Sequence, residues 1–193
     1  MHAMQDQRGA PLTERRDRHT PRLAWWALLI AAATLLADQA TKAWALRSLT
    51  PGESLEVVGD LLRITLIRNA GAAFSIGNQA TWLLTLVSVG ILVVIVRSIR
   101  RLGHWGWTVC LGLLLGGAVG NLIDRLFREP GVGRGHVIDF IDYGGLFVGN
   151  VADIAIVGGA GLLLWLVFTN IGIDGSRPQH AAGHERPTED TDE

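Results

Sequence analysis

The sequence has little of what several common classes of site require. Its 193 residues contain one cysteine, Cys110, so an internal disulfide is impossible, and its place within an apolar stretch fits a small buried hydrophobic residue. The net charge of −1 provides no basic field, so we expect no nucleic-acid partner. The patterns H-E-x-x-H and G-x-S-x-G are absent, which leaves zinc and serine peptidases with little support. His136, a lone histidine without a serine or cysteine partner, is weak evidence for a general base.

Long apolar runs dominate what is present. Hydrophobic residues make up 49% of the chain and are concentrated in blocks at 23–37, 80–96, 105–123 and 151–171. A helix that crosses a bilayer needs about 20 mostly apolar residues, which the last three blocks provide directly. The first block reaches that length if it continues through Asp38 to about Trp44. It could instead be a cleaved signal peptide with an A-x-A site at 43–45, but Asp38 and Lys42 interrupt the approach to that site and disfavour cleavage.

We therefore predict an all-α membrane protein with spans at about 23–44, 80–97, 105–124 and 151–171, which form one membrane domain over 23–172. Residues 1–22 carry five arginines and are predicted to be a disordered cytoplasmic arm, and residues 97–104 carry three more. Arginine-rich connections favour the inner side of a membrane. Four spans return the acidic tail, 173–193, to the same side, and its composition predicts disorder.

The two connections predicted to face outward contain structure and chemistry. Segment 54–68 is rich in Val, Leu, Ile and Thr around a turn signal at 59–60, which predicts a small extracytoplasmic β element. Segment 125–150 is rich in glycine and contains both Asp139 and Asp142. A long loop of this composition is usually functional or disordered.

Two acidic residues occupy positions where a charge is costly. Asp153 lies two residues into the last apolar run, and Asp139 lies just before that run. A carboxylate at a membrane boundary is expensive and by default indicates a functional site. Two carboxylates that converge can share one proton and activate a water, so the sequence predicts an aspartic peptidase that needs no metal and no cofactor. Asp142 lies three residues from Asp139, and the residues alone separate these two only weakly.

Polar residues are concentrated at the predicted outer ends of the spans, in stretches at 38–42, 68–75, 116–125, 135–140 and 150–153. These stretches resemble the signature blocks of the lipoprotein signal peptidase family, also called signal peptidase II, and the resemblance extends over roughly 23–171. It implies an intramembrane aspartic endopeptidase of the bacterial inner membrane with its site toward the extracytoplasmic side. The implied substrate is a membrane-tethered, diacylated prolipoprotein, cleaved on the N-terminal side of its diacylglyceryl-modified cysteine. Membrane lipid is the other expected partner, and a monomer is favoured.

The resemblance also implies which residues act. The family's catalytic dyad matches Asp139 in Val-Ile-Asp-Phe and Asp153 in Asn-x-Ala-Asp. One departure is visible, because the family often has phenylalanine where this chain has Gly149, a change expected to alter the pocket wall. The supporting polar positions that the resemblance implies are Asp38, Asn69, Asn121, Asp124, Arg125 and Asn150.

Some of these positions also have simpler interpretations. Asp38 lies one helical turn before Lys42, so a local ion pair at the membrane interface is an alternative to a role in the site. Asn69 and Asn150 either orient the dyad and bind substrate backbone or serve as turn residues, which asparagine favours. Arginine pairs well with carboxylates, so the Asp-Arg pair at 124–125 is predicted to hold the end of the third span against the loop that follows.

Two other classes of protein stay open when the residues are taken alone. A proton-coupled transporter or channel subunit uses membrane acids as a relay, but it would distribute them through the depth of the bilayer, whereas these acids cluster at one end of the spans. A structural scaffold of glycine-packed helices would account for the glycines but not for the aspartates.

Overall fold

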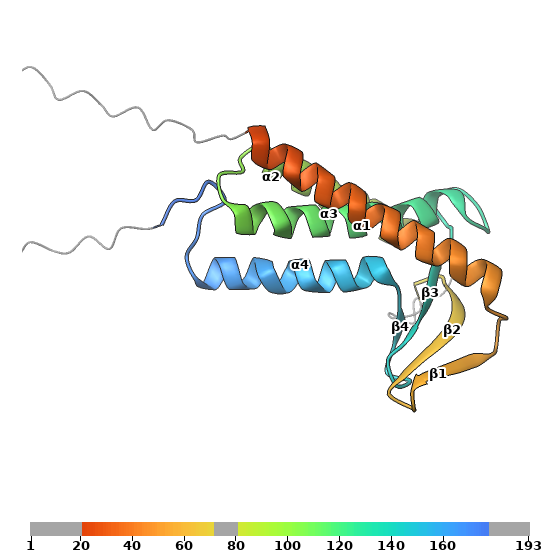
Figure 1. The fold of residues 1–193 in the computed structure, drawn as a ribbon. Coiled ribbons are helices and arrows are strands. Elements are labelled where there is room, and N and C mark those ends of the chain that lie inside the picture. The colour runs from red at the N-terminus through yellow and green to blue at the C-terminus, as the bar shows by residue number, and fades with distance from the viewer. Residues whose placement is uncertain (1–20, 72–80, 178–193) are drawn as a thin grey trace, which may run out of the picture.

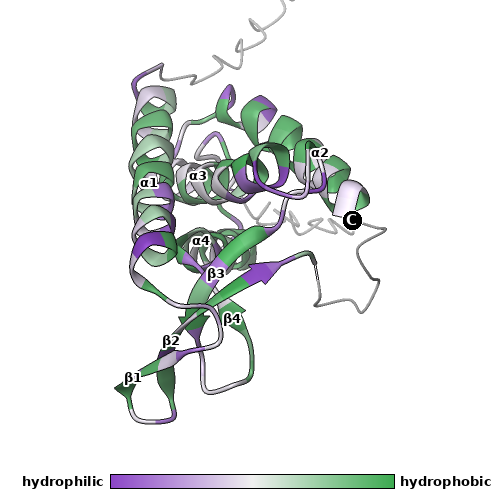
Figure 2. Cartoon of the chain, turned by 90° about the vertical axis from the view of Figure 1, so that its right-hand side faces the viewer, coloured by the Kyte–Doolittle hydropathy of each residue, from purple (hydrophilic) through white to green (hydrophobic). Residues whose placement is uncertain are grey.

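The computed structural model describes residues 21–71 and 81–177, and within these ranges it contains four helices and a small antiparallel sheet (Figure 1). Each helix is long and apolar enough to cross a membrane, so the predicted fold class is confirmed and the chain is a multi-pass membrane protein. In Figure 2, most of each helix ribbon has the colours of hydrophobic residues. The helices are α1 (Pro21–Ser48), α2 (Thr81–Ile99), α3 (Trp105–Phe127) and α4 (Val151–Phe168).

Helix α3 is central and packs against each of the other helices. Glycines spaced four residues apart in its sequence are typical of helices that pack closely. The structure shows which atoms lie against these glycines. A Cβ atom on Gly116 would lie 2.6 Å from the carbonyl oxygen of Ala31 in α1, and one on Gly117 would lie 2.7 Å from that of Ala152 in α4. The glycines therefore admit both α1 and α4.

The sheet lies at one end of the bundle and has the strand order β1-β2-β3-β4 within the described residues (Figure 1). Its first hairpin, β1 (Ser54–Val58) and β2 (Leu62–Asn69), confirms the predicted β element. The turn between these strands contains Gly59, whose φ of 48° lies in the region that favours glycine. Strand β3 (Val137–Asp142) pairs antiparallel with β2, and β4 (Val148–Gly149) pairs antiparallel with β3.

Strands β3 and β4 correct the expectation of a loop over 125–150. The composition of that segment suggested a loop because acids and glycines interrupt its apolar residues. In the fold, Ile138 and Phe140 are almost completely buried with Ala45 of α1 and Leu66 of β2. Burial against the sheet and the end of α1 therefore decides the strand, and it places Asp139 on a rigid element rather than on a loop.

The opposite end of the bundle is closed by short connections. The amide of Gly103 donates a hydrogen bond to the carbonyl oxygen of Ile173, at 3.0 Å, and the indole of Trp107 donates one to Ile171, at 2.9 Å. Helix α4 thus ends at Phe168, before the expected 171, and residues 173–177 are held in a turn that the sequence had assigned to the disordered tail. Helix α1 likewise begins at Pro21, a residue well suited to a first helical position. The rest of both predicted arms lies outside the described residues.

Candidate active site

The start of α4 fixes the first of the two predicted carboxylates. Asn150 is the N-cap, and its side-chain oxygen accepts a hydrogen bond from the amide of Asp153 at 3.0 Å. In return, Oδ2 of Asp153 accepts one from the amide of Asn150 at 3.0 Å, which completes a capping box. The positive end of the helix dipole also favours a carboxylate in this first turn. Local helix chemistry therefore holds Asp153 at the sheet-facing end of its span.

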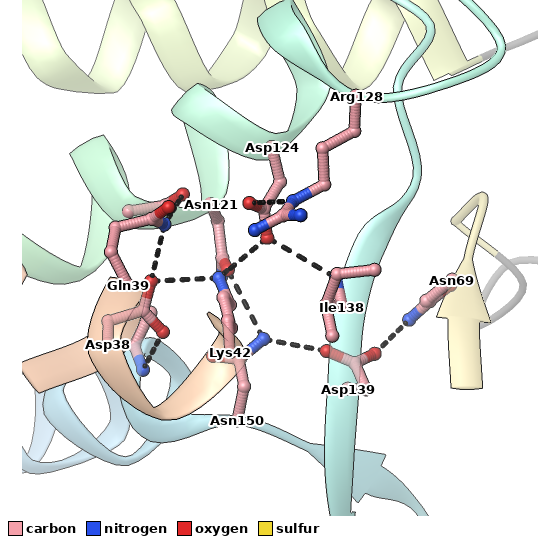
Figure 3. A network of polar contacts seen from close by, with 12 residues as sticks. Asp38, Gln39, Lys42, Asn69, Asn121, Asp124, Arg128, Ile138, Asp139 and Asn150 are labelled. Atoms are coloured by element: carbon pink, nitrogen blue, oxygen red, sulfur yellow. Dashed lines mark hydrogen bonds and ion pairs between the residues drawn. The ribbon is translucent and has the colours of Figure 1, made fainter. Parts of the chain in front are cut away.

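The second predicted carboxylate, Asp139 on β3, is 2% exposed and is held from both sides. Its Oδ2 accepts a hydrogen bond from Nδ2 of Asn69 on β2 at 2.9 Å, and its Oδ1 accepts one from Nδ2 of Asn150 at 2.6 Å (Figure 3). Asn150 consequently contacts both aspartates. Asn121 of α3 adds a further link, because its Nδ2 donates to Oδ1 of Asp153 at 2.9 Å. The structure brings both aspartates and these three asparagines, five predicted site residues, into one hydrogen-bonded cluster.

A buried ion network lies behind this cluster and is centred on Lys42 of α1 (Figure 3). Its Nζ lies 2.9 Å from Oδ2 of Asp38 and 2.8 Å from Oδ2 of Asp124, and all three side chains are completely buried. Nζ also donates to Oδ1 of Asn121 at 3.0 Å, which joins the network to the aspartate cluster. The local Asp38–Lys42 pair predicted as an alternative therefore exists, but it is part of a wider network.

The carboxylates of this network also hold the surrounding backbone. Oδ1 of Asp38 accepts a hydrogen bond from the amide of Ala152 at 3.0 Å, which satisfies a free N–H at the start of α4. Oδ2 of Asp124 accepts one from the amide of Ile138 at 3.3 Å. Asp124 thereby ties the end of α3 to the strand that carries Asp139, the kind of role predicted for the pair at 124–125.

The arginine that pairs with Asp124 is not the one that was expected. Asp124 pairs with Lys42 and with Nε of Arg128, one helical turn further along α3, rather than with Arg125. A helical spacing of four residues faces the same side, whereas adjacent residues diverge. Nε of Arg125 is buried and has no hydrogen-bond partner among the residues that the structure describes. Its charge interacts electrostatically with both Asp139 and Asp153.

The sequence reasoning missed several members of the network. The sequence predicts for Lys42 no partner other than Asp38, and it indicates no role for Gln39 or Arg128. Nε2 of Gln39 donates to Oδ2 of Asp38 at 3.0 Å and to the carbonyl oxygen of Gly120 at 3.2 Å. A lysine inside a candidate span was itself a usable signal, because a cation at membrane depth needs more than one acceptor.

Asp142, the sequence rival of Asp139, is separated from the site by strand geometry. Alternating side chains of a strand point to opposite faces, so residues three apart do not share a face. Oδ2 of Asp142 lies 2.9 Å from Nη2 of Arg63, and Oδ1 accepts a hydrogen bond from the amide of Gly145 at 2.7 Å. That bond and the Arg63 guanidinium lower the pKa of Asp142. Asp142 is the buried last residue of β3 and makes these contacts away from the dyad.

Asp139 has the electrostatics of a proton-holding group. Burial raises its pKa from 3.8 to about 6, and the negative charge of Asp153 adds to that rise. The hydrogen bonds from Asn69 and Asn150 and the charge of Lys42 act in the opposite direction. Up to about pH 6, Asp139 can therefore hold a proton beside the negative charge of Asp153.

The same pKa predicts how stability depends on pH. The folded protein retains a proton on Asp139 between pH 3.8 and about 6, where the unfolded chain has already released it. The free energy of unfolding should therefore fall as pH rises through this window, and a pKa difference of this size corresponds to on the order of 3 kcal/mol. Thermal unfolding between pH 4 and 7 should show this slope for the wild type and a flatter one for Asp139→Asn. Identical slopes would contradict the prediction.

The structure combines a bundle of membrane-spanning helices with two carboxylates at one end, Asp153 on a helix and Asp139 on a strand, both hydrogen-bonded to Asn150. These are the features of a membrane-embedded aspartic peptidase. Residues 30–169 match the model of the family described as Signal peptidase (SPase) II. The chain belongs to the signal peptidase II family, and it is an aspartic peptidase that removes signal peptides from prolipoproteins.

Individual relatives agree with this assignment. The chain is 47% identical to the lipoprotein signal peptidase of Mycolicibacterium smegmatis over 165 residues, which cover 86% of this chain and 68% of that one. It is 50% identical to the one from Mycobacterium avium over 155 residues, which cover 80% and 84% of the two chains. A solved bacterial membrane enzyme is also similar, with a TM-score of 0.66 and 29% identity over 75% of this chain and 93% of that one.

Proposed function

We propose that Asp139 and Asp153 are the catalytic dyad and that they cleave the precursor on the N-terminal side of a diacylglyceryl-modified cysteine. The observation that carries this proposal is the position of Asn150, whose side chain and backbone contact both carboxylates. Two carboxylates that share one residue in this way cannot both ionise easily, so one of them keeps a proton. The pKa of about 6 at Asp139 supports this state.

The chemistry follows from one shared proton. The ionised carboxylate removes a proton from a water, and the water oxygen attacks the carbonyl carbon of the scissile peptide bond. The protonated carboxyl group donates to the carbonyl oxygen, so a tetrahedral diol forms. Collapse of the diol breaks the C–N bond, and the amine leaves with a proton from the dyad. The two acids titrate as a unit, so base and acid are not assigned to particular residues.

The supporting residues divide into two groups in this proposal. Asn69, Asn121 and Asn150 orient the dyad, because each donates a hydrogen bond to a dyad carboxylate. Arg125 binds the substrate. A buried donor without a partner is costly, and a peptide carbonyl oxygen beside the dyad would satisfy it.

The arginines support an orientation for the protein in the bacterial inner membrane. Arg97, Arg100 and Arg101 lie at the end of the bundle opposite the sheet, and arginine in short connections favours the cytoplasm. In this orientation both termini are cytoplasmic and the dyad lies at the extracytoplasmic boundary. We propose that a monomer acts here on a substrate whose lipid stays in the bilayer.

Cleavage by the purified full-length protein tests this function. A diacylated precursor should yield one new amino terminus, at the modified cysteine, and a signal peptide with a free carboxyl end. Mass spectrometry of both products identifies the bond. The same precursor without the diacylglyceryl group is the control and should be cleaved far more slowly. Cleavage at another bond, or equal cleavage of the two precursors, would overturn the proposed specificity.

A further inference from the structure

The turn between β3 and β4 carries an aromatic pair that the catalytic chemistry does not use. It contains Tyr143, the chain's only tyrosine, and Phe147. Their rings are stacked, with centroids 4.5 Å apart and planes inclined by 20°, and the amide of Tyr143 donates a hydrogen bond to the carbonyl oxygen of Phe147 at 3.0 Å. Phe147 is nevertheless 55% exposed. The pair therefore offers an apolar surface that the fold itself leaves largely uncovered.

This surface lies next to Asp153. A Cβ atom on Gly149 would be 3.0 Å from Oδ2 of Asp153 and 3.4 Å from Cε2 of Phe147, so the ring edge and the carboxylate flank the same small space. Burial raises the pKa of the Tyr143 phenol, and the negative charge of Asp153 raises it further, which agrees with a second ring near that carboxylate.

The ring of Phe147 lies where a side chain at position 149 would begin. Phe147 directly precedes β4, and its Cε2 lies 3.4 Å from the place of a Cβ atom on Gly149. The backbone of Gly149 has no positive φ that would require glycine. The absence of a side chain at Gly149 therefore leaves the space beside Asp153 open, and the ring of Phe147 reaches its edge.

We propose that Phe147, supported by Tyr143, forms the apolar wall of the substrate site beside Asp153 and contacts an apolar group of the substrate next to the scissile bond. The inference rests on the proposed catalytic role of Asp153. An exposed aromatic ring gains from burial by a ligand, because it presents a large rigid apolar area at low cost in side-chain freedom. The apolar group belongs either to a peptide side chain or to an acyl chain of the modified cysteine.

Moving the aromatic ring from position 147 to position 149 tests the proposal. Phe147→Ala should lower kcat/KM for a diacylated precursor by about tenfold, mainly through a higher KM. Gly149→Phe alone should also be impaired, because the new side chain meets both the Phe147 ring and Asp153. The double variant Phe147→Ala/Gly149→Phe should be more active than Gly149→Phe alone, since one ring then fills one space, but it should stay below the wild type because the contact with Asp153 remains.

Leu146→Ala is the matched control, because Leu146 is the adjacent residue and is 88% exposed. It should keep wild-type kcat/KM. If Phe147→Ala behaves like this control, or if the double variant is no more active than Gly149→Phe, the inference is overturned while the proposed function stands. If the wild type does not cleave the precursor, both are overturned.

Two substrate series identify the apolar group. One series varies only the size of the apolar side chain beside the scissile bond, and the other varies only acyl-chain length. A loss in Phe147→Ala that grows with side-chain size assigns the contact to the peptide, and one that grows with acyl length assigns it to the lipid. A loss that is independent of both would contradict a contact with the substrate.

Discussion

Asp139→Asn and Asp153→Asn are each expected to abolish cleavage of a diacylated precursor while the protein stays folded. Asparagine keeps the shape of aspartate and can still accept a hydrogen bond, but it cannot exchange a proton with water or with the scissile carbonyl. Positioned acid and base groups contribute about 10²- to 10⁴-fold to rates, and both roles depend on the shared proton, so the loss should reach roughly 10⁴-fold. Single-turnover cleavage by equal amounts of purified folded protein measures it.

Asp142→Asn is the matched control for the dyad variants. Asp142 lies on the same strand as Asp139 and is similarly buried, but it pairs with Arg63 and does not contact Asn150 in any hydrogen bond of the described residues. This variant should retain activity close to that of the wild type. Robust cleavage by Asp139→Asn or by Asp153→Asn, or equal losses in all three variants, would overturn the assignment of the dyad.

Lys42→Met is expected to produce the largest loss of stability. The lysine lies within 3 Å of a carboxylate oxygen on both Asp38 and Asp124, and all three side chains are fully buried. Methionine has a similar length but no charge, so Asp38 would be left without a cation and Asp124 would keep only Arg128. Breaking a buried ion pair by removing one partner costs about 3–5 kcal/mol, because the remaining charge stays desolvated. Denaturant unfolding in a detergent micelle measures the difference from the wild type.

Arg68→Met provides the comparison for a surface pair. Arg68 and Glu129 form an ion pair at 3.2 Å, but their side chains are 55% and 86% exposed. Solvent screens such pairs, so this variant should lose less than about 1 kcal/mol. Adding Asp38→Asn to Lys42→Met should restore part of the lost stability, because it removes the carboxylate that has no other cation. Equal effects of Lys42→Met and Arg68→Met would show that the buried network does not hold the helices together.

Much of the fold could be predicted from local patterns. The apolar blocks predicted the membrane-spanning helices, since length and composition alone decide whether a helix can cross a bilayer. The β-rich segment 54–68 predicted the hairpin, because its residue types and turn signal are local. The predicted spans differ from the helices mainly at their ends, where turns such as the one after Phe168 depend on contacts with the connection at Gly103.

The strand that carries Asp139 could not be predicted in this way. Its acids occur at every third residue, which is not the alternation typical of a strand, and the strand forms because β2 pairs with it and α1 packs against it. The choice between Asp139 and Asp142 has the same origin. Family resemblance named Asp139, but the residues alone could not, since only the orientation of the strand sends one toward Asn150 and the other toward Arg63.

By itself, the sequence determined that this chain crosses a membrane, that its acids lie at one end of its spans, and that Asp153 lies near the start of the last span, because hydropathy acts over short distances along the chain. Only the tertiary structure decided that Lys42 joins acids from two helices, that Asp124 pairs with Arg128 instead of Arg125, and that Asn150 connects Asp139 to Asp153. These contacts join residues from α1, α3, α4 and the sheet. A buried charge pairs with the groups that lie next to it, and the packing of these elements determines which groups those are.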